Sequence, residues 1–263
     1  MTDVTFEDLG LSKPLLDAVN DLGYEAPSQI QAIAIPEILA GHDIVGLSET
    51  GSGKTAAFVL PALEMVDTDI ARPQVLILSP TRELCVQISE EVGKLGKHLP
   101  RLQSTPVYGG APIDRQIRGL RGAQMVVGTP GRLMDHLRRG TLRTDDLKLI
   151  ILDEADRMLD MGFRDDMEEI LGQVKTDYQT LFFSATMNRN VERLIAKFGK
   201  EPKKVEVAKK ALTVDRIKQS YFEVRNRSKV EVLSRILDMD AFRLAVVFCN
   251  TKRAVDEATE ALL

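Results

Sequence analysis

The sequence predicts an α/β fold in which helices flank a parallel sheet, and three observations support this expectation. Short apolar runs recur along the chain, and each is followed by a turn and a segment with helical spacing. The runs are almost continuously hydrophobic, which is typical of strands buried on both faces of a parallel sheet. Glycine-rich and acidic motifs come directly after several runs, where a doubly wound sheet places its ligand site.

Strands and helices are expected to alternate through most of the chain. Helical spacing predicts helices at Ala56–Glu64, Arg82–Leu95 and Arg132–Arg138. The expected strands are Asp43–Leu47, Val75–Ser79, Met125–Gly128, Leu149–Leu152 and Leu181–Phe183, with Val205–Val207 as a candidate last strand.

The pattern changes near Pro202, where a polar connector, Lys209–Arg216, follows the last candidate strand. We therefore expect a first domain over residues 1–208, a linker over 209–217 and a second unit over 218–263. Two strands and two helices offer little apolar surface for an independent core, so we expect this unit to be an incomplete α/β domain. Its expected elements are strand Gln219–Val224, helix Ser228–Leu237, strand Leu244–Cys249 and helix Lys252–Leu263.

The composition is that of a soluble enzyme. Apolar residues make up 44% of the 263 residues, and the formal net charge is −4, so the overall charge does not predict a nucleic-acid binder. The two cysteines, Cys85 and Cys249, form no CxxC pair, which argues against a zinc site or a disulfide framework. The sequence shows no signal peptide and no run of membrane-spanning length. We expect a cytoplasmic monomer without a membrane partner.

A glycine-rich loop, Ser48–Thr55, lies between an expected strand and an apolar helix. Backbone N–H groups of such a loop bind phosphates at a helix N-terminus. Lys54 is placed to contact the β- and γ-phosphates of ATP, and the Thr55 hydroxyl to bind Mg²⁺. Ser48 replaces the first glycine of the strict pattern, and the alternative is a chance glycine-rich turn. The predicted nucleotide-binding residues of this loop are Thr50, Gly51, Ser52, Gly53, Lys54 and Thr55.

An acidic motif, Asp153-Glu154-Ala155-Asp156, follows the apolar run Lys148–Leu152. A carboxylate at a strand end beside the phosphate loop suits a Mg²⁺ ligand, so Asp153 is expected to hold the ion, through water. Glu154 is then placed to orient and deprotonate the attacking water. Lys54, Asp153 and Glu154 are thus the candidate catalytic residues, and the alternative for the acidic motif is an ordinary helix N-cap.

Asp-Glu-Ala-Asp is also the motif that names the DEAD-box ATP-dependent RNA helicases, and the chain resembles this family from Phe6 to Thr251. The resemblance implies a RecA-like fold for the first domain, ATP and Mg²⁺ as ligands, and RNA as partner. Further segments resemble family motifs in the family's order: Gly23–Gln31 (Q motif), Pro80–Leu84 (Ia), Gly109-Gly110, Thr129–Arg132 (Ib), Ser184–Thr186 (III) and Val247–Thr251 (IV).

The resemblance assigns an adenine pocket to the N-terminal region. It implies that Gln31 reads the adenine edge with its amide, that Phe6 lies against the base, and that Tyr24 shapes the pocket. The alternative for Phe6 is a plain core position. Gln29 departs from the family, which has Pro or Ala there, and this puts the geometry of the loop in question.

The resemblance also implies an RNA-binding track that reads the sugar–phosphate backbone with little sequence specificity. Taken singly, its residues are also common in helix caps and turns. Phe163 and Arg164 are a weaker candidate contact that bends the strand, with packing at a helix end as the alternative. The implied track consists of Pro80, Thr81, Arg82, Gly109, Gly110, Thr129, Pro130, Gly131, Arg132, Asn250 and Thr251.

Ser184 and Thr186 are implied to bond Asp156 and so to couple the nucleotide state to domain closure. The alternative is that Ser184 caps the following helix.

Nothing in the sequence resembles the family's late His-Arg-x-Gly-Arg or Asp-x-x-x-Arg-Gly-x-Asp motifs. Such arginine fingers contribute about 10³–10⁵ to the rate of hydrolysis. We therefore expect a piece of a larger helicase that hydrolyses ATP slowly and unwinds RNA weakly by itself. The alternatives are a nucleotide- and RNA-binding module without turnover, a P-loop ATPase acting on a partner other than nucleic acid, and a DNA helicase.

Overall fold

The computed structural model describes residues 4–48, 51–206, 220–239 and 244–262. The chain divides into two units, Met1–Lys210 and Ala211–Leu263, which are considered separately. The expected linker over residues 209–217 lies wholly outside the described residues. Among the described residues, none of the helices combines the length and the apolar character that a membrane crossing requires.

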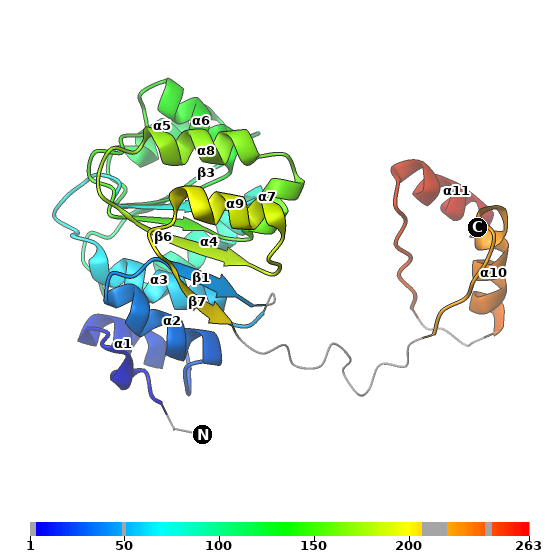
Figure 1. Cartoon of the computed structure of the whole chain (residues 1–263), viewed down its shortest axis with the longest axis horizontal. Helices are drawn as coiled ribbons and strands as arrows, with labels where there is room; N and C mark the ends of the chain where they lie inside the picture. The colour runs from blue at the N-terminus through cyan, green and yellow to red at the C-terminus, as the bar shows by residue number, and fades with distance from the viewer. Residues whose placement is uncertain (1–3, 49–50, 207–219, 240–243, 263) are drawn as a thin grey trace. The chain divides into compact units, whose positions relative to one another are not determined.

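A seven-stranded sheet forms the centre of the first unit, and every strand pair in it is parallel. The strand order is β3-β4-β2-β5-β6-β1-β7, with helices covering both faces (Figure 1). This is the doubly wound α/β fold that the sequence predicts. The strands are β1 (Ile44–Leu47), β2 (Val75–Leu78), β3 (Ser104–Val107), β4 (Met125–Gly128), β5 (Leu149–Leu152), β6 (Gln179–Ser184) and β7 (Lys203–Glu206).

Alternate side chains of the five inner strands face two separate hydrophobic clusters. Ile44 belongs to the cluster beneath α1 to α4, whereas its neighbour Val45 belongs to the cluster beneath the later helices. The helices are α1 (Lys13–Asp21), α2 (Gln29–Leu39), α3 (Lys54–Met65), α4 (Arg82–Leu95), α5 (Ile113–Leu120), α6 (Pro130–Arg138), α7 (Ala155–Asp160), α8 (Arg164–Gln173) and α9 (Arg189–Phe198), with a 3₁₀ turn at Glu7–Leu9.

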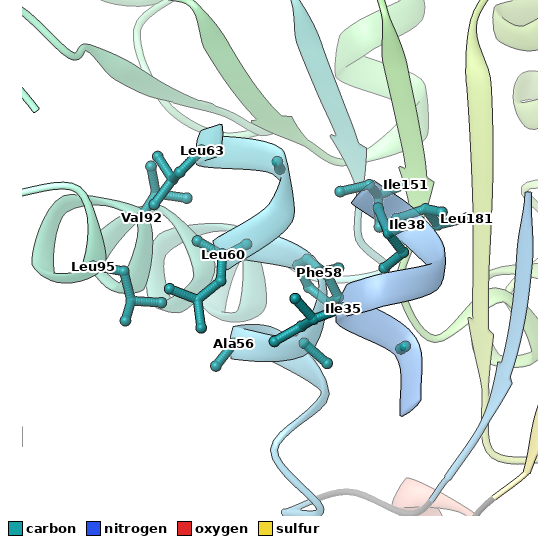
Figure 2. Close-up of a cluster of buried hydrophobic side chains, with 14 of the residues drawn as sticks. Ile35, Ile38, Ala56, Phe58, Leu60, Leu63, Val92, Leu95, Ile151 and Leu181 are labelled. Carbon is teal, nitrogen blue, oxygen red and sulfur yellow. The ribbon is translucent and has the colours of Figure 1, made fainter. Parts of the chain in front are cut away.

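Helix α3 is the most deeply buried helix of the first cluster, and its side chains from Ala56 to Leu63 are all buried. Figure 2 shows Phe58 and Leu60 of α3 among apolar side chains of α2, α4 and the sheet. Phe58 packs on Phe183 of β6 at 5.3 Å between ring centroids. This packing fixes the start of α3, and therefore Lys54, at the carboxyl edge of the sheet.

The expected strands and helices of the first unit are confirmed, with small shifts at their ends. Helix α3 begins at Lys54 rather than Ala56, and α6 at Pro130 rather than Arg132. The last strand is Lys203–Glu206, slightly earlier than expected. Strand β3 was not predicted, because it is a half-buried edge strand that contains Pro106.

In the second unit the two expected helices are confirmed as α10 (Lys229–Met239) and α11 (Lys252–Leu262), and a 3₁₀ turn covers Asn226–Ser228. The two expected strands are wrong, since residues 220–224 and 244–249 form no strand in the described part of this unit. Strand pairing requires a neighbour for the backbone N–H and C=O groups. Apolar side chains that would face a core remain exposed instead, as in Phe248, which is 92% exposed.

Candidate functional site

The strands end in register at one edge of the sheet and bring the predicted motifs together there. Leu47 at the end of β1 pairs with Ser184 of β6. Leu78 at the end of β2 pairs with both Leu152 of β5 and Gly128 of β4. The glycine-rich loop, the acidic motif and the starts of α4 and α6 therefore all follow strand ends along the same edge.

The glycine-rich loop depends on two glycines with left-handed backbone angles, Gly51 at φ +83° and Gly53 at φ +91°. Gly53 is the N-cap of α3, so the first N–H groups of this helix are available to an anion. Lys54 follows as the first helical residue, and its buried Nζ donates to the Ser48 carbonyl at 3.1 Å. Ser48, the departure from the strict pattern, also accepts a hydrogen bond from the Ser52 hydroxyl at 3.0 Å. Thr50 lies outside the described residues.

Gln31 connects the start of α2 to this loop. Its Oε1 accepts a hydrogen bond from the Ser28 amide at 2.8 Å, and its Nε2 donates to the Gly53 carbonyl at 3.1 Å. A Cβ on Gly53 would lie 2.7 Å from Gln31 Nε2 and 2.8 Å from Ser28 Oγ, so glycine is required there for space as well as for φ. Both ends of the Gln31 amide are therefore engaged within the protein.

The predicted aromatic residues of the adenine pocket pack against each other. Phe6 and Tyr24 form an edge-to-face pair with 5.9 Å between centroids and an 86° interplanar angle. Phe6 is 5% exposed and belongs to the first hydrophobic cluster. Phe6 therefore occupies a core position in this structure, as the alternative for this residue had it.

Asp153 is a buried carboxylate at the end of β5. Burial raises the pKa of Asp153 to about 6, although the nearby Lys54 ammonium lowers it. Its Oδ1 is buried and has no hydrogen-bond partner among the described residues. A buried carboxylate oxygen without a donor suits a hard cation, and Mg²⁺ commonly uses one or two carboxylates together with phosphate oxygens and waters. The half-buried Thr55 hydroxyl, two residues after Gly53, completes the donor set that fits this ion.

Glu154 adopts a left-handed backbone conformation, with φ 52° and ψ 49°, just before α7. Such a conformation is strained for a residue with a Cβ, by about 1–3 kcal/mol, and strained residues cluster at functional sites. Its Oε2 accepts a hydrogen bond from Arg157 Nη1 at 3.0 Å. The sequence carries no sign of this strain, because acidic residues near helix starts are ordinary.

The expected contact between the acidic motif and Thr186 is present. Asp156 Oδ2 accepts hydrogen bonds from the Thr186 hydroxyl at 2.8 Å and from its amide at 2.9 Å. Burial raises the pKa of Asp156, but hydrogen bonds from Thr186, the nearby Ser184 hydroxyl and neighbouring amides lower it more, so the net direction is downward. The Ser184 hydroxyl donates its proton to the Thr186 carbonyl at 2.8 Å rather than to Asp156, so of the two expected bonds to Asp156 the structure shows the one from Thr186. Helix α9 is capped by Asn188 rather than by Ser184, so the capping alternative is wrong.

The predicted RNA-binding residues of the first unit surround the starts of α4 and α6. Thr81 caps α4 by accepting a hydrogen bond from the Leu84 amide at 3.3 Å, and Thr129 precedes α6. The exposed Arg82 guanidinium stacks on the Tyr108 ring at 4.9 Å. Pro80 precedes α4, and Pro130, Gly131 and Arg132 form the first turn of α6, whereas Gly109 and Gly110, the latter with φ +81°, lie on the loop between β3 and α5.

The remaining candidates lie elsewhere. Asn250 and Thr251 belong to the second unit, where Thr251 caps α11 by accepting a hydrogen bond from the Ala254 amide at 3.1 Å. Phe163 precedes α8 and packs against the second hydrophobic cluster. Arg164 Nη2 donates to Asn190 Oδ1 at 2.5 Å and so connects α8 to α9.

A polar network beneath the double-glycine loop was not predicted. Arg132 Nη1 donates to the Ala111 carbonyl and to Gln116 Oε1, both at 3.1 Å. Gln116 Nε2 donates to the Tyr108 carbonyl at 2.9 Å, so the two ends of the loop are held by α5 and α6. Gln116 and His136 are polar residues on the buried sides of α5 and α6. The one signal in the sequence is a polar residue at a position where the helical spacing calls for an apolar one.

The partners in this network define the protonation of His136. Its Nε2 lies 3.0 Å from Gln116 Oε1, an atom that can only accept, so Nε2 carries the proton. Burial, followed by the nearby charge of Arg132, lowers the pKa of His136. The ring is therefore neutral near pH 7, and the Thr141 hydroxyl lies within hydrogen-bond distance of both its Nδ1, at 2.8 Å, and the His136 carbonyl, at 3.1 Å.

The parallel sheet, the glycine-rich loop and the acidic strand end together define a P-loop nucleotide-binding domain. Residues 28–194 match the DEAD/DEAH box helicase family. The chain belongs to this family.

Relatives and solved structures agree with this assignment. The chain is 49% identical over 261 residues to the ATP-dependent RNA helicase DeaD of Escherichia coli K12, covering 99% of this chain and 42% of the relative. It is 48% identical over 259 residues to the DEAD-box ATP-dependent RNA helicase CshA of Bacillus cereus, covering 98% of this chain and 49% of the relative. The chain thus spans less than half the length of these curated relatives.

Two solved structures share the fold. A crystal structure of a DEAD box protein from Methanococcus jannaschii matches with a TM-score of 0.76 and 41% identity, covering 98% of this chain and 69% of that one. A hypothetical ATP-dependent RNA helicase from Sulfolobus tokodaii matches with a TM-score of 0.71 and 34% identity, covering 75% and 57%. The expected RecA-like fold of this family is therefore confirmed.

Proposed function

We propose that this chain binds ATP with Mg²⁺ and the sugar–phosphate backbone of RNA. In our proposal it forms the ATP-binding part of an ATP-dependent RNA helicase that separates short duplexes locally. The observation that carries the proposal is the meeting of two sets of residues along one sheet edge. Lys54 and Asp153 make up the first set, and the starts of α4 and α6 belong to the second. The names of the similar helicases support the same reading.

In the ATP complex, Lys54 exchanges the Ser48 carbonyl for the β- and γ-phosphates, and the N–H groups at the start of α3 bind phosphate oxygens. Thr55 and, through water, Asp153 would hold Mg²⁺, and the ion would supply positive charge to the phosphates. Glu154 orients and deprotonates the attacking water.

Adenine recognition rests on Gln31 in this proposal. Gln31 uses one N–H of its amide on Gly53 and one lone pair of its oxygen on Ser28, so a second N–H and a second lone pair remain for the edge of a base. The affinities of wild type and variant for ATP and for GTP test this adenine recognition. Gln31→Ala should reduce the ratio of ATP affinity to GTP affinity, whatever happens to the affinity itself. Equal affinities for ATP and GTP before the substitution would refute the adenine assignment.

The proposed RNA track binds phosphates through the helix starts at Thr81 and Thr129 and through Arg82. Arg132 acts in part by holding Ala111, and with it the double-glycine loop, in place. Asn250 and Thr251 add contacts from the second unit. We infer that residues 1–208 form the first helicase domain, that 209–217 form a linker, and that 218–263 begin a second RecA-like domain.

Hydrolysis by this chain alone is expected to be slow, because no segment of it resembles the arginine-finger motifs of the family. A finger contributes about 10³–10⁵ to the rate, which is roughly 4–7 kcal/mol of barrier. A second candidate function follows from the same observation, namely a nucleotide- and RNA-binding module without turnover.

Lys54→Ala tests the nucleotide site. A charge-assisted hydrogen bond contributes about 1.5–3 kcal/mol, so ATP affinity should fall by roughly 10- to 100-fold in calorimetric titrations with Mg²⁺. Lys175→Ala serves as control, since Lys175 is an exposed lysine between α8 and β6. Unchanged ATP affinity in the Lys54 variant would refute the proposed site.

A further inference from the structure

Three arginines form an exposed basic face on and after α5. Arg115 and Arg118 are exposed one helical turn apart, and Arg121 follows at the C-cap. Gln116 and Leu120 occupy the buried side of the same helix. None of the three guanidinium groups has a hydrogen bond or an ion pair with any residue that the structure describes. Their charges are therefore directed to solvent.

The arginines of the neighbouring helix α6 differ in this respect. Arg138 pairs with Glu169 at 3.1 Å, and Arg139 pairs with Asp135 at 2.6 Å. Asp114 is the single acidic residue of α5 itself, and it lies in the first turn. In a chain with a formal net charge of −4, the three α5 arginines form a local concentration of uncompensated positive charge.

This basic face is fixed relative to the proposed RNA track. The double-glycine loop leads through Ala111 and Pro112 directly into α5, and α5 lies beside α6 (Figure 1). Gln116, on the inner side of α5, bonds the Tyr108 carbonyl before the loop and Arg132 of α6. The loop and the arginine face therefore form one continuous surface on a rigid support.

We propose that Arg115, Arg118 and Arg121 bind phosphates of an RNA strand that continues past the double-glycine loop, and so lengthen the RNA-binding surface of the first domain. This inference rests on the proposed function. A guanidinium group binds phosphate through two parallel N–H donors and is suited to this contact. Residues three apart on a helix present side chains about 5–6 Å apart, so neighbouring arginines can contact the same strand.

The chemistry of this face favours RNA over an acidic protein segment. Protein interfaces have an apolar centre with aromatic anchors. None of the exposed large hydrophobic side chains in the described part of the chain lies on α5 or on the loop before it. Charge without an apolar centre is typical of backbone-phosphate binding.

The size of the effect follows from counterion release. For single strands each phosphate contact adds about 0.7 to the slope of log affinity against log salt. At about 0.1 M salt this corresponds to roughly 5-fold in affinity per contact, and to roughly 20-fold for two contacts.

The test uses the full 263-residue chain and the double substitution Arg115→Gln with Arg118→Gln. The matched control is Arg143→Gln with Lys175→Gln, which removes two exposed positive charges from the loops before β5 and β6, at the opposite edge of the sheet. Affinities for single-stranded RNAs of increasing length are measured by NMR titration, with Mg²⁺ and a non-hydrolysable ATP analogue present, at several salt concentrations.

We expect the α5 variant to match the wild type on the shortest RNAs and to lose roughly 20-fold on the longer ones, with a salt slope lower by about 1.4. The control should bind every length as the wild type does. Equal losses in both variants, or no loss at any length, would overturn the inference while leaving the proposed function intact. If the wild type binds no RNA of any length, the proposed function fails and the inference with it. Retained RNA binding with lost binding of polyglutamate, used as an acidic probe, would assign the face to a protein partner instead.

Discussion

At the scale of single residues, the site contains groups that are unfavourable in the isolated protein and useful to a ligand. Asp153 is buried with an unpartnered oxygen, and Glu154 is held in a left-handed conformation. The Lys54 ammonium donates a hydrogen bond to the Ser48 carbonyl. Unpartnered buried groups and strained backbone conformations are expected at functional sites. A bound ligand can supply the missing partner.

The raised pKa of Asp153 gives a prediction about stability. Because its folded pKa is about 6 and its ordinary value is 3.8, the folded state binds the proton more tightly than the unfolded state does. The destabilisation by this carboxyl is therefore absent below pH 4, grows between pH 4 and 6, and is complete above that range. Asp153→Asn should raise the free energy of unfolding of the ligand-free protein at pH 7 by about 1–3 kcal/mol.

Urea unfolding at several pH values measures this effect as the difference between wild type and variant. The difference should vanish near pH 4, and Mg²⁺-dependent ATP binding should be lost in the variant. A variant that is less stable than the wild type at pH 7 would contradict the account of the buried carboxyl.

The residues that motif chemistry identifies could be predicted from the sequence, because their spacing from strand ends is local information. Lys54 and Asp153 belong to this group, whereas the contact of Thr186 with Asp156, across 30 residues of sequence, was expected only from the resemblance to the family. Gln116 and His136 could not be predicted, since their partners are brought together only when α5 packs beside α6. The engagement of Gln31 with Gly53 is likewise a product of tertiary structure, across 22 residues of sequence.

At the scale of elements, the double-glycine loop is positioned by two helices. Gln116→Ala would remove the side-chain donor to the Tyr108 carbonyl, the acceptor of His136 Nε2 and one of the two acceptors of Arg132 Nη1. Unsatisfied buried polar groups cost about 1–3 kcal/mol each, with partial relief by water, so we expect a loss of about 2–4 kcal/mol in the free energy of unfolding. RNA affinity should fall as well, because the loop is no longer held.

Gln173→Ala is the matched control for this substitution. Gln173 is an exposed residue near the end of α8 whose amide contacts only Glu169 among the described residues, so its removal should change stability by less than about 0.5 kcal/mol. Equal stabilities of the two variants in urea unfolding would show that the network does not support the loop.

The helices and strands that the sequence predicts correctly are those whose apolar pattern follows from burial. The prediction failed for segments whose structure depends on pairing with a neighbouring strand. The central strands are continuous apolar runs, and each was recognised. Strand β3 was not predicted, because the sequence of an edge strand that contains a proline resembles that of a loop. The second unit shows the reverse error, since its apolar runs lack a neighbouring strand in the described residues.

At the scale of the whole molecule, the first unit carries the proposed nucleotide site and the proposed RNA track on one sheet. The second unit contributes Asn250 and Thr251 to the predicted RNA-binding set, and the sequence offers no arginine finger. The chain also spans less than half of its curated relatives. In our proposal this chain binds ATP and RNA, and efficient hydrolysis requires a complete second RecA-like domain.

The rate of ATP hydrolysis with and without duplex RNA tests this central claim most directly. It is measured on the 263-residue chain, on the same chain extended by a complete second RecA-like domain, and on Glu154→Gln versions of both. We predict little RNA stimulation for the chain alone and a rate at least about 10³ higher for the extended chain with RNA, abolished by Glu154→Gln. Strong RNA-stimulated hydrolysis by the 263-residue chain alone would contradict the claim, and equal stimulation of the extended chain by duplex DNA would contradict the assignment of RNA as partner.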